Sequence, residues 1–285
     1  MAEIKVSELT HTYSADTPFE KTAIDNISIT VPRGQFVGVI GHTGSGKSTF
    51  IQHLNALLKP SRGKVEIDGA DINATKHSAK EARVRVGLVF QYPEYQLFEE
   101  TVYKDIAFGP TNMKLSEAEV DERIREAAEL VGISEELFDR SPLELSGGQK
   151  RRVAIAGVIA MRPEVLIMDE PTAGLDPAGC EQILDTITDY RKRTGSTVII
   201  VSHSMDDVAR LVERLVVFSK GRIVFDGTPE EVFSKPEELK KIGLSVPEPT
   251  EIALALKKRG VLIDRPVYTN EQLISAILEM GKEGE

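Results

Sequence analysis

Residues that can bind phosphate stand at 41–48, where the sequence reads GHTGSGKS after the apolar run FVGVI. Glycines at this spacing let successive backbone N–H groups converge on phosphate oxygens, and the start of a following helix adds the positive end of its dipole. Lys47 supplies a point charge for the β- and γ-phosphates, and the Ser48 hydroxyl can coordinate Mg²⁺. A glycine-rich turn without a ligand is the alternative. The context of strand, loop and helix disfavours it, so the stretch predicts a nucleotide site.

Two carboxylates, Asp169 and Glu170, end another apolar run, VLIMDE. Ligands of open α/β sheets bind outside the carboxyl ends of the strands, so both acids are expected beside the phosphate loop. Asp169 is then suited to help hold Mg²⁺, and Glu170 to orient and deprotonate an attacking water. Taken alone, paired acids at a strand end are equally well explained as a solvated cap. Together with the phosphate loop they indicate phosphoryl chemistry.

A second glycine-bearing helix start lies in ELSGGQKRR, residues 144–152. Ser146 and Gln149 have the S-x-x-Q spacing of a capping box, which satisfies free donors at a helix start. Capping gives no reason for Gly147 and Gly148, because glycine lowers helix stability. Glycine is useful where the backbone must come close to something else. We therefore interpret these four residues as a second anion-binding surface.

One chain with two phosphate sites on separate subdomains is explained most economically by a head-to-tail dimer. Each ATP then lies between the phosphate loop of one subunit and the Ser-Gly-Gly-Gln of the other. A phosphate loop with an acidic strand end is shared by kinases, GTPases, helicases and transporter motors. The second helix start is the feature that separates these classes.

The elements that position these residues are predicted from periodicity. Near-continuous apolar runs are typical of strands buried on both faces, and helical segments between them predict a parallel sheet covered by helices. Alternating patterns near the N-terminus predict half-exposed antiparallel strands, and 214–227 predicts a hairpin. Ser116 and Glu119 form a capping box before a helix, and short capped helices are expected from Thr228 and from Ser234. The buried strands are expected at 36–40, 86–90, 165–168 and 197–202.

Composition limits the remaining classes. The chain has 285 residues, a formal net charge of −10 and 41% hydrophobic residues, which is enough for a sizeable core and unlike a general nucleic-acid binder. No apolar run is long enough to span a bilayer, and the first ten residues lack the features of a secretory signal. The single cysteine, Cys180, excludes an internal disulfide and fits a reducing cytosol.

From about residue 4 to residue 228 the sequence resembles an ATP-binding-cassette (ABC) ATPase. GHTGSGKS matches the Walker A motif, VLIMDE matches Walker B, LSGGQ matches the family signature and AGLD matches the D-loop. The resemblance implies an α/β P-loop NTPase fold with a parallel core sheet, an antiparallel β subdomain and a helical signature subdomain at about 92–160. It implies ATP and Mg²⁺ as ligands. Residues 1–228 are expected to form the ATPase domain and residues 229–285 a small helical C-terminal region.

The resemblance also implies roles for single residues. Gln91 resembles the glutamine that senses γ-phosphate and Mg²⁺, His203 resembles the histidine that contacts γ-phosphate, and Tyr13 resembles the aromatic that stacks on adenine. An ordinary strand aromatic is the alternative for Tyr13. The implied catalytic residues are Glu170, His203 and Gln91, and the implied metal ligands are Ser48, Gln91 and Asp169. The implied nucleotide-binding residues are Tyr13, Gly41, His42, Thr43, Gly44, Ser45, Gly46, Lys47, Ser48 and Thr49. The residues implied to act on the partner's ATP are Ser146, Gly147, Gly148 and Gln149, with Asp176 in the D-loop.

A narrower resemblance is to the ATPases of energy-coupling factor (ECF) transporters, which include the cobalt- and vitamin-uptake group. It is carried by FQYPEYQLFEETVYKDIAFGPTN (90–112), YSADTPFEKTAID (13–25) and AIAGVIAMRPEVLIMDEPTAGLDP (154–177). The TPFE insertion and YPEYQLFEETV are more similar to the second of the two paralogous ECF ATPases than to the first. The intact Glu170 and signature give no sign of a degenerate half-site.

This resemblance implies an ATPase subunit, peripheral at the cytoplasmic face of the cell membrane, that drives uptake of a vitamin or a transition-metal ion. The implied partners are a paralogous ATPase, in a heterodimer rather than a homodimer, a transmembrane coupling protein and a membrane-embedded substrate-binding subunit, with no nucleic acid. The alternative is a soluble ABC-type mechano-ATPase acting on nucleic acid or ribosomes. Such proteins carry tandem cassettes or a long coiled-coil insertion, whereas only 99 positions separate Lys47 from Ser146 here. A regulatory nucleotide-binding module is a third class, disfavoured by the intact Glu170 and His203.

The stretch after Gln91 carries an additional hypothesis. Tyr92, Tyr95, Leu97 and Phe98 are interleaved with charged residues. These side chains either seat the helical subdomain on the core or form an exposed groove for a helix of the membrane partner. The sequence leaves both interpretations open.

Overall fold

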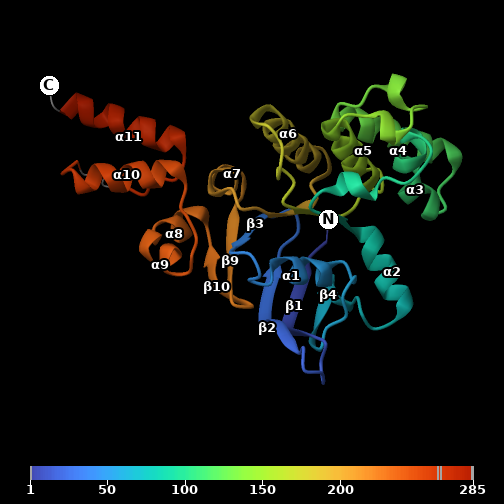
Figure 1. Ribbon diagram of the computed structural model, residues 1–285, viewed down its shortest axis with the longest axis horizontal. Helices are drawn as coiled ribbons and strands as arrows, with labels where there is room; N and C mark the ends of the chain where they lie inside the picture. Colours follow the sequence, from blue (N-terminus) through green and yellow to red (C-terminus); the bar gives the residue numbers. More distant parts are fainter. Residues whose placement is uncertain (1, 262, 264, 284–285) are drawn as a thin grey trace.

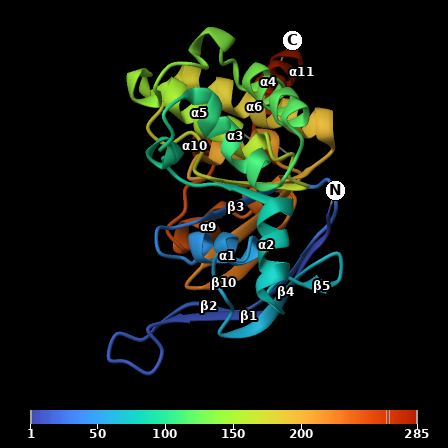
Figure 2. The same ribbon diagram turned by 90° about the vertical axis from the view of Figure 1, so that its right-hand side faces the viewer.

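The computed structural model describes residues 2–261, 263 and 265–283. Figure 1 shows a central sheet with the N-terminal strands (blue) below it, a helical group (green) above it on one side, and the C-terminal helices (orange and red) on the other side. The N-terminal region and the helical group are separate layers in Figure 2. The predicted signature lies in the helical group and the predicted phosphate loop in the lower part.

The core sheet is made mainly of parallel strands. In the described part of the chain it is 6-stranded, with the order β10-β9-β3-β8-β7-β6, and β10 is antiparallel to β9. The predicted buried strands and the predicted hairpin at 214–227 are confirmed. The strands are β3 (Phe36–Gly41), β6 (Val86–Val89), β7 (Val165–Asp169), β8 (Thr197–Val201), β9 (Arg214–Ser219) and β10 (Arg222–Gly227).

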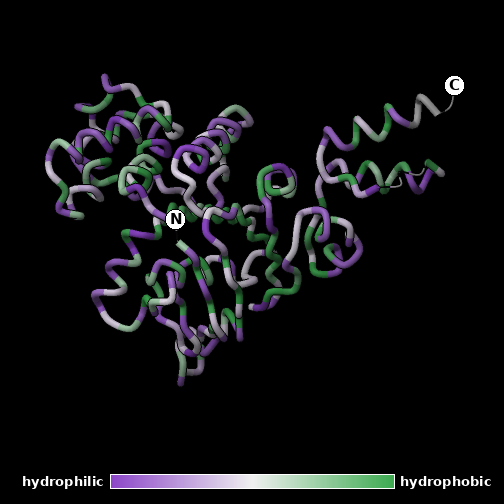
Figure 3. The backbone as a smooth tube through the Cα atoms, turned by 180° about the vertical axis from the view of Figure 1, so that it is seen from behind, coloured by the Kyte–Doolittle hydropathy of each residue, from purple (hydrophilic) through white to green (hydrophobic). Residues whose placement is uncertain are grey.

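Both faces of the core sheet are buried. Successive side chains of a strand point to opposite sides, so each strand contributes to a core on either face. Phe36 and Ile40 of β3 pack into a core shared with the helical group, whereas Val37 and Val39 pack into a second core shared with the N-terminal strands. Figure 3 shows the hydrophobic stretches running through the strands in the middle of the molecule. The sheet is therefore a shared wall between two hydrophobic cores.

The N-terminal strands form the predicted antiparallel sheet, with the order β2-β1-β4-β5. Its strands are β1 (Ile4–Tyr13), β2 (Lys21–Val31), β4 (Arg62–Ile67) and β5 (Ala70–Asp71). Helix α1 (Lys47–Leu54) follows β3, and α2 (Lys76–Arg85) leads into β6. The loop between β1 and β2 projects away from the rest of the molecule in Figure 2.

The helical group carries the predicted signature. Ser116 and Glu119 form the predicted capping box, because the Ser116 side chain accepts from the Glu119 backbone and the Glu119 side chain accepts from the Ser116 backbone. The elements of the group are η1 (Pro93–Gln96), α3 (Val102–Asn112), α4 (Glu117–Val131), η2 (Glu135–Leu137), η3 (Pro142–Glu144) and α5 (Gly147–Ile159). Between the later strands lie α6 (Pro177–Thr194) and α7 (Met205–Leu211).

The C-terminal region is helical, with α8 (Pro229–Phe233), α9 (Pro236–Lys241), α10 (Glu248–Lys258) and α11 (Asn270–Glu283). The predicted cap at Thr228 is confirmed by a capping box with Glu231. The predicted cap at Ser234 is wrong, because Ser234 has helical φ and ψ at the end of α8 and Lys235 takes the N-cap position of α9 without a side-chain cap. The division of the chain at residue 229 stays a prediction.

Candidate nucleotide site

The phosphate loop joins β3 to α1, and two of its glycines are held by close contacts within the chain. A Cβ atom at Gly41 would lie 2.5 Å from the carbonyl oxygen of Phe218, and one at Gly46 would lie 2.7 Å from that of Ala23. Gly46 is also left-handed, with φ of 107°. The hairpin turn closes over the loop, because the Gly221 backbone N–H donates to the Ser45 carbonyl at 3.0 Å. Strands distant in sequence thus shape this loop.

The interior of the loop fits an anion. Gly46 caps α1 without a side-chain hydrogen bond, and a Cβ atom at Gly44 would meet nothing within 4 Å. The buried Ser45 Oγ has no hydrogen-bond partner within the described residues. Unpaired buried donors and an uncapped helix start are the groups that a phosphate would satisfy. His42 and Thr43, by contrast, contact each other, with His42 Nδ1 2.8 Å from the Thr43 carbonyl oxygen.

Lys47 is buried at the base of the loop, with 5% of its surface exposed. Its Nζ donates to the Gly41 carbonyl at 2.6 Å and to the His42 carbonyl at 3.3 Å. Burial lowers the pKa of Lys47, while the nearby carboxylates of Glu170 and Asp169 raise it. The lysine is therefore a desolvated cation between the loop and the acidic end of β7.

Asp169 ends β7 and is 7% exposed. Burial raises the pKa of its carboxyl group, and a hydrogen bond with the Ser48 side chain lowers it. A hydroxyl and a carboxylate side by side are oxygen ligands of the kind that Mg²⁺ takes in nucleotide sites. The structure thus brings together Ser48 and Asp169, two of the three residues that the sequence assigned to metal binding.

The Glu170 carboxylate contacts the two other predicted catalytic residues, one with each oxygen. Gln91 Nε2 donates to Glu170 Oε2 at 2.9 Å, and His203 Nε2 lies 2.8 Å from Glu170 Oε1. These residues follow β6, β7 and β8, which are neighbours in the sheet. Glu170 has a left-handed backbone with φ of 50°, and its N–H donates to the Val201 carbonyl at 2.9 Å. Such backbone strain is concentrated at functional sites.

Tyr13 ends β1 beside the first turn of α1. Its hydroxyl lies 3.2 Å from Thr49 Oγ1, and the residue is 40% exposed. A cavity of about 420 Å³ opens between this ring and the phosphate loop. The cavity is lined by Tyr13, Lys21, Thr22, Ala23, Gly44, Gly46, Lys47, Ser48, Thr49, Lys220 and Gly221. The position suits a base attached to the phosphates.

The predicted signature opens α5 in the helical group. Gln149 N–H donates to Ser146 Oγ at 3.3 Å and Ser146 N–H donates to Gln149 Oε1 at 2.9 Å, which confirms the capping box. A Cβ atom at Gly147 or Gly148 would meet nothing within 4 Å. Packing within the chain therefore gives no reason for these glycines. The D-loop Asp176 caps α6, where its Oδ1 accepts from the Gly179 N–H at 2.7 Å.

Arg151 was missed by the sequence analysis. It is 2% exposed, although it lies only two positions after Gln149. Its Nε donates to Glu94 at 3.1 Å, and its Nη1 donates to the carbonyl of Ala173 at 2.7 Å. Arg151 thus ties the signature helix to the segment after Gln91 and to the segment after Glu170. The cationic run KRR was visible in the sequence, but nothing there marks which of its members is buried.

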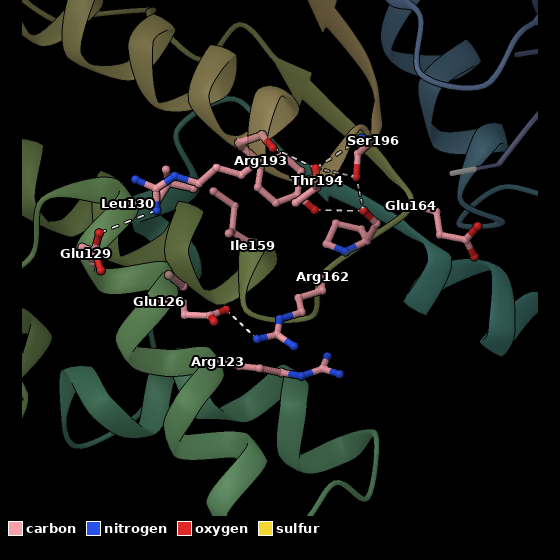
Figure 4. Close-up of a pocket in the computed structure, with 13 residues that line it drawn as sticks. Arg123, Glu126, Glu129, Leu130, Ile159, Arg162, Glu164, Arg193, Thr194 and Ser196 are labelled. Atoms are coloured by element: carbon pink, nitrogen blue, oxygen red, sulfur yellow. Dashed lines mark hydrogen bonds and ion pairs between the residues drawn. The ribbon is translucent and has the colours of Figure 1, made fainter.

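A larger cavity lies away from the predicted residues. Figure 4 shows it beside α4, the turn before β7 and the end of α6, and its volume is about 620 Å³. Two of its arginines face carboxylates of the same walls, since Arg162 Nη2 lies 2.5 Å from Glu126 and Arg193 Nη1 lies 3.6 Å from Glu129. Arg123 Nη1 instead donates to the Met161 carbonyl at 3.2 Å. The charges of this cavity are thus partly paired within it.

Comparison with known proteins agrees with this geometry. A family model described as "ABC transporter" matches residues 24–173, which include the phosphate loop, Gln91, the signature and Glu170. The "Energy-coupling factor transporter ATP-binding protein EcfA2" of Caldanaerobacter subterraneus is 57% identical, over 96% of this chain and 96% of that protein. The chain belongs to the ABC transporter family. Within it, the chain is a member of the energy-coupling factor transporter ATP-binding proteins and an ATP-hydrolysing subunit of such an importer.

Other relatives support the same placement. The EcfA2 protein of Clostridium tetani is 53% identical over 97% of this chain and 96% of its own length. The structure of cbiO1 from Clostridium perfringens, described as part of the ABC transporter complex cbiONQ, has a TM-score of 0.74 and 40% identity, covering 87% of this chain and 97% of that one. The cassette MJ0796, solved as a dimer bound to ADP and Pi, has a TM-score of 0.71 and 30% identity, covering 79% and 98%. Among the described residues, no helix is both long and apolar enough to cross a membrane.

Proposed function

We propose that Glu170 is the general base of ATP hydrolysis and that Gln91 and His203 hold its carboxylate in place. The observation that carries the proposal is the pair of contacts at 2.9 Å and 2.8 Å that fix both carboxylate oxygens. The Glu170 carboxylate also raises the pKa of Lys47 in the phosphate loop, which supports this role. A general base must lie within reach of the proton that it removes. The Glu170 carboxylate is fixed by Gln91 and His203, which follow the two strands next to β7.

In this proposal the phosphate loop and Lys47 bind the phosphates of ATP. Ser48, Gln91 and Asp169 would hold Mg²⁺, which would supply positive charge against the phosphate oxygens. Glu170 takes a proton from water as the water oxygen bonds to the γ-phosphorus, and the bond between that phosphorus and the oxygen of the departing ADP breaks. The products are ADP and inorganic phosphate. The His203 nitrogen that contacts Glu170, Nε2, is suited to turn to the γ-phosphate and donate to it as charge develops there. Gln91 then keeps the Glu170 carboxylate in place.

The second part of the proposal is that Ser146, Gly147, Gly148 and Gln149 complete the nucleotide site of a partner ATPase. Open space around both glycines supports this, because contacts within the chain leave them unexplained. The dimeric MJ0796 cassette provides a related assembly. We favour a paralogous ATPase as the partner, in a heterodimer, and peripheral attachment at the cytoplasmic face of the membrane. The transported substrate is a vitamin or a transition-metal ion, carried by a membrane-embedded substrate-binding subunit.

The docking surface for the transmembrane coupling protein is proposed to lie on the segment after Gln91. Tyr95 is 84% exposed and Phe98 is 64% exposed, with the Phe98 ring against Phe108 at 4.9 Å. Leu97, in contrast, packs against the main hydrophobic core. The packing interpretation thus describes Leu97, and the docking interpretation describes Tyr95 and Phe98. Exposed aromatic anchors of this kind suit a helix of a membrane partner.

The test of the chemistry is Glu170→Gln, which keeps the shape of the side chain. We expect Mg·ATP to bind as before while turnover falls by about 100-fold or more, as for other positioned bases. Turnover is measured as phosphate release and binding as nucleotide affinity. Glu81→Gln, on an exposed carboxylate of α2, is the matched control and keeps full turnover. Wild-type turnover in Glu170→Gln would remove this residue from the role of base.

The test of the docking surface is Phe98→Glu, compared with Phe19→Glu on another exposed aromatic. We expect Phe98→Glu to abolish co-purification with the membrane subunit from detergent-solubilised membranes, and Phe19→Glu to retain it. Thermal melting of the purified chain should be the same for both. A retained complex in Phe98→Glu contradicts the docking role, and a large loss of thermal stability assigns Phe98 to packing instead.

A further inference from the structure

Two histidines are buried beneath the predicted adenine-binding ring. His11 on β1 is 9% exposed and His53 on α1 is 0% exposed. His53 Nε2 lies 3.2 Å from His11 Nδ1, and the ring centroids are 4.8 Å apart. Burying a polar ring costs stability unless its nitrogen atoms are paired, so an apolar side chain would serve a purely structural position better.

The hydrogen bonds fix the direction of this pair. His53 Nδ1 lies 2.7 Å from the Thr49 carbonyl oxygen, which can only accept, so Nδ1 carries the proton. Burial lowers the pKa of His53, while its contacts with the backbone of Thr49 and Lys59 oppose this shift. The net direction favours the neutral ring, in which Nδ1 carries the proton and Nε2 accepts. His11 Nδ1 is therefore the donor. A single orientation of both rings follows from these contacts.

The two histidines and Tyr13 are connected by a closed series of contacts. The rings of His11 and Tyr13, which lie on the same face of β1, meet edge to face with centroids 4.5 Å apart. The Tyr13 hydroxyl returns to Thr49 Oγ1 at 3.2 Å. Tyr13, His11, His53 and Thr49 thus form a closed ring of contacts. It connects the end of β1 to the first turn of the phosphate-loop helix.

We propose that His11 and His53 are positioning residues that hold Tyr13 in register with the phosphate loop, so that the base and the phosphates of one nucleotide are bound together. The proposal rests on the role proposed above for Tyr13 as the adenine-stacking residue. Without the pair, the Tyr13 ring loses its contact with His11. Of the two contacts that Tyr13 makes in this series, only that of its hydroxyl with Thr49 then remains to position its side chain, so the base is bound less well. The phosphates, which contact other residues, are unaffected.

The experiment compares the affinities of the full chain for Mg·ATP and for inorganic tripolyphosphate, which has no base. His11→Leu removes both the ring contact and the donor. We expect its dissociation constant for ATP to rise about 5- to 10-fold, the effect of losing a well-placed aromatic contact. The dissociation constant for tripolyphosphate should stay within about twofold of the wild type. His77→Leu, on the exposed His77 of α2, is the matched control and changes neither.

Two further variants distinguish the ring contact with Tyr13 from the hydrogen bond with His53. They also replace His11→Leu in the test if that variant does not fold. His11→Phe keeps an aromatic ring against Tyr13 and lacks the donor, so we expect it to recover part of the ATP affinity. His11→Asn keeps a donor at the position of Nδ1 and lacks the ring. Equal losses for ATP and tripolyphosphate in either soluble variant overturn the proposal, because they indicate general support of the loop.

Tyr13→Ala distinguishes this proposal from the one on which it rests. If Tyr13→Ala leaves ATP affinity unchanged, the adenine role of Tyr13 is wrong. If Tyr13→Ala weakens ATP binding and His11→Leu does not, the positioning role of the histidines is wrong. In the Tyr13→Ala background we expect His11→Leu to have no additional effect, because the pair acts through Tyr13. Additive effects overturn the proposal.

Discussion

The phosphate loop and the signature both place glycines at a helix start, but their surroundings differ. At the phosphate loop, added Cβ atoms at Gly41 and Gly46 would collide with carbonyl oxygens of this chain at 2.5 Å and 2.7 Å. At the signature, Gly147 and Gly148 have open space around them. The first loop lacks a side-chain cap at Gly46, whereas the second is fully capped by Ser146 and Gln149.

This difference separates two reasons for a glycine. Gly41 and Gly46 of the phosphate loop are required by the fold of the chain, because backbone carbonyl groups of Phe218 and Ala23 leave no room for a Cβ atom there. The glycines of the signature are not required by any contact among the described residues. Their requirement is therefore expected to lie in another molecule, which is why we assign the signature to a partner's nucleotide.

The largest expected effect compares Lys47→Ala with Ser146→Arg. Lys47→Ala removes charge-assisted contacts and should weaken ATP binding by the isolated chain about 10- to 100-fold. Ser146→Arg should leave that affinity intact and block ATP-dependent dimerisation with a wild-type partner, because the long cation fills the surface above the glycines. Nucleotide titration and analytical ultracentrifugation measure the two effects. Normal dimerisation of Ser146→Arg would reduce the signature to a helix cap.

An effect on stability alone is expected at Arg151, which holds the signature helix to other segments of its own chain. Arg151→Met leaves Glu94 without its buried partner and removes the donor to the carbonyl groups of Pro171 and Ala173. It should cost about 2–3 kcal/mol in the free energy of unfolding. Urea denaturation measures this. Arg152→Met, one position further along α5, is the control and should cost less than half as much. Equal costs for the two variants contradict the special place of Arg151.

The last prediction compares one glycine of the phosphate loop with one glycine of the signature. Gly46→Ala forces a left-handed alanine against the Ala23 carbonyl and should cost about 1–3 kcal/mol of stability. Gly148→Ala should leave stability unchanged or slightly higher, because alanine is the better helix former. It should nevertheless impair ATP-dependent dimerisation. If Gly148→Ala assembles normally, the open space at the signature has no partner phosphate in it.

The sequence predicted the local features of this molecule and missed the long-range ones. The buried strands and the capping box at Ser116 depend on neighbours in sequence, so periodicity and spacing reveal them. The loop around Lys47 was recognisable from its motif, but the contacts with Phe218 and Gly221 that shape it were not. Arg151 and His53 became recognisable only when segments far apart were brought together. The predicted cap at Ser234 was wrong because Ser234 is the C-cap of α8, where its backbone is helical and cannot take the extended conformation of an N-cap.

The hairpin turn over the phosphate loop has a consequence for synthesis. Residues 41–48 leave the ribosome early, but the contacts that shape them come from Phe218 and Gly221, which are added more than half a chain later. Because a chain is made from its N-terminus, a nascent fragment carries the complete loop sequence without its partners. We therefore expect a nascent chain to bind ATP only after β9 and β10 have been synthesised and added to the core sheet.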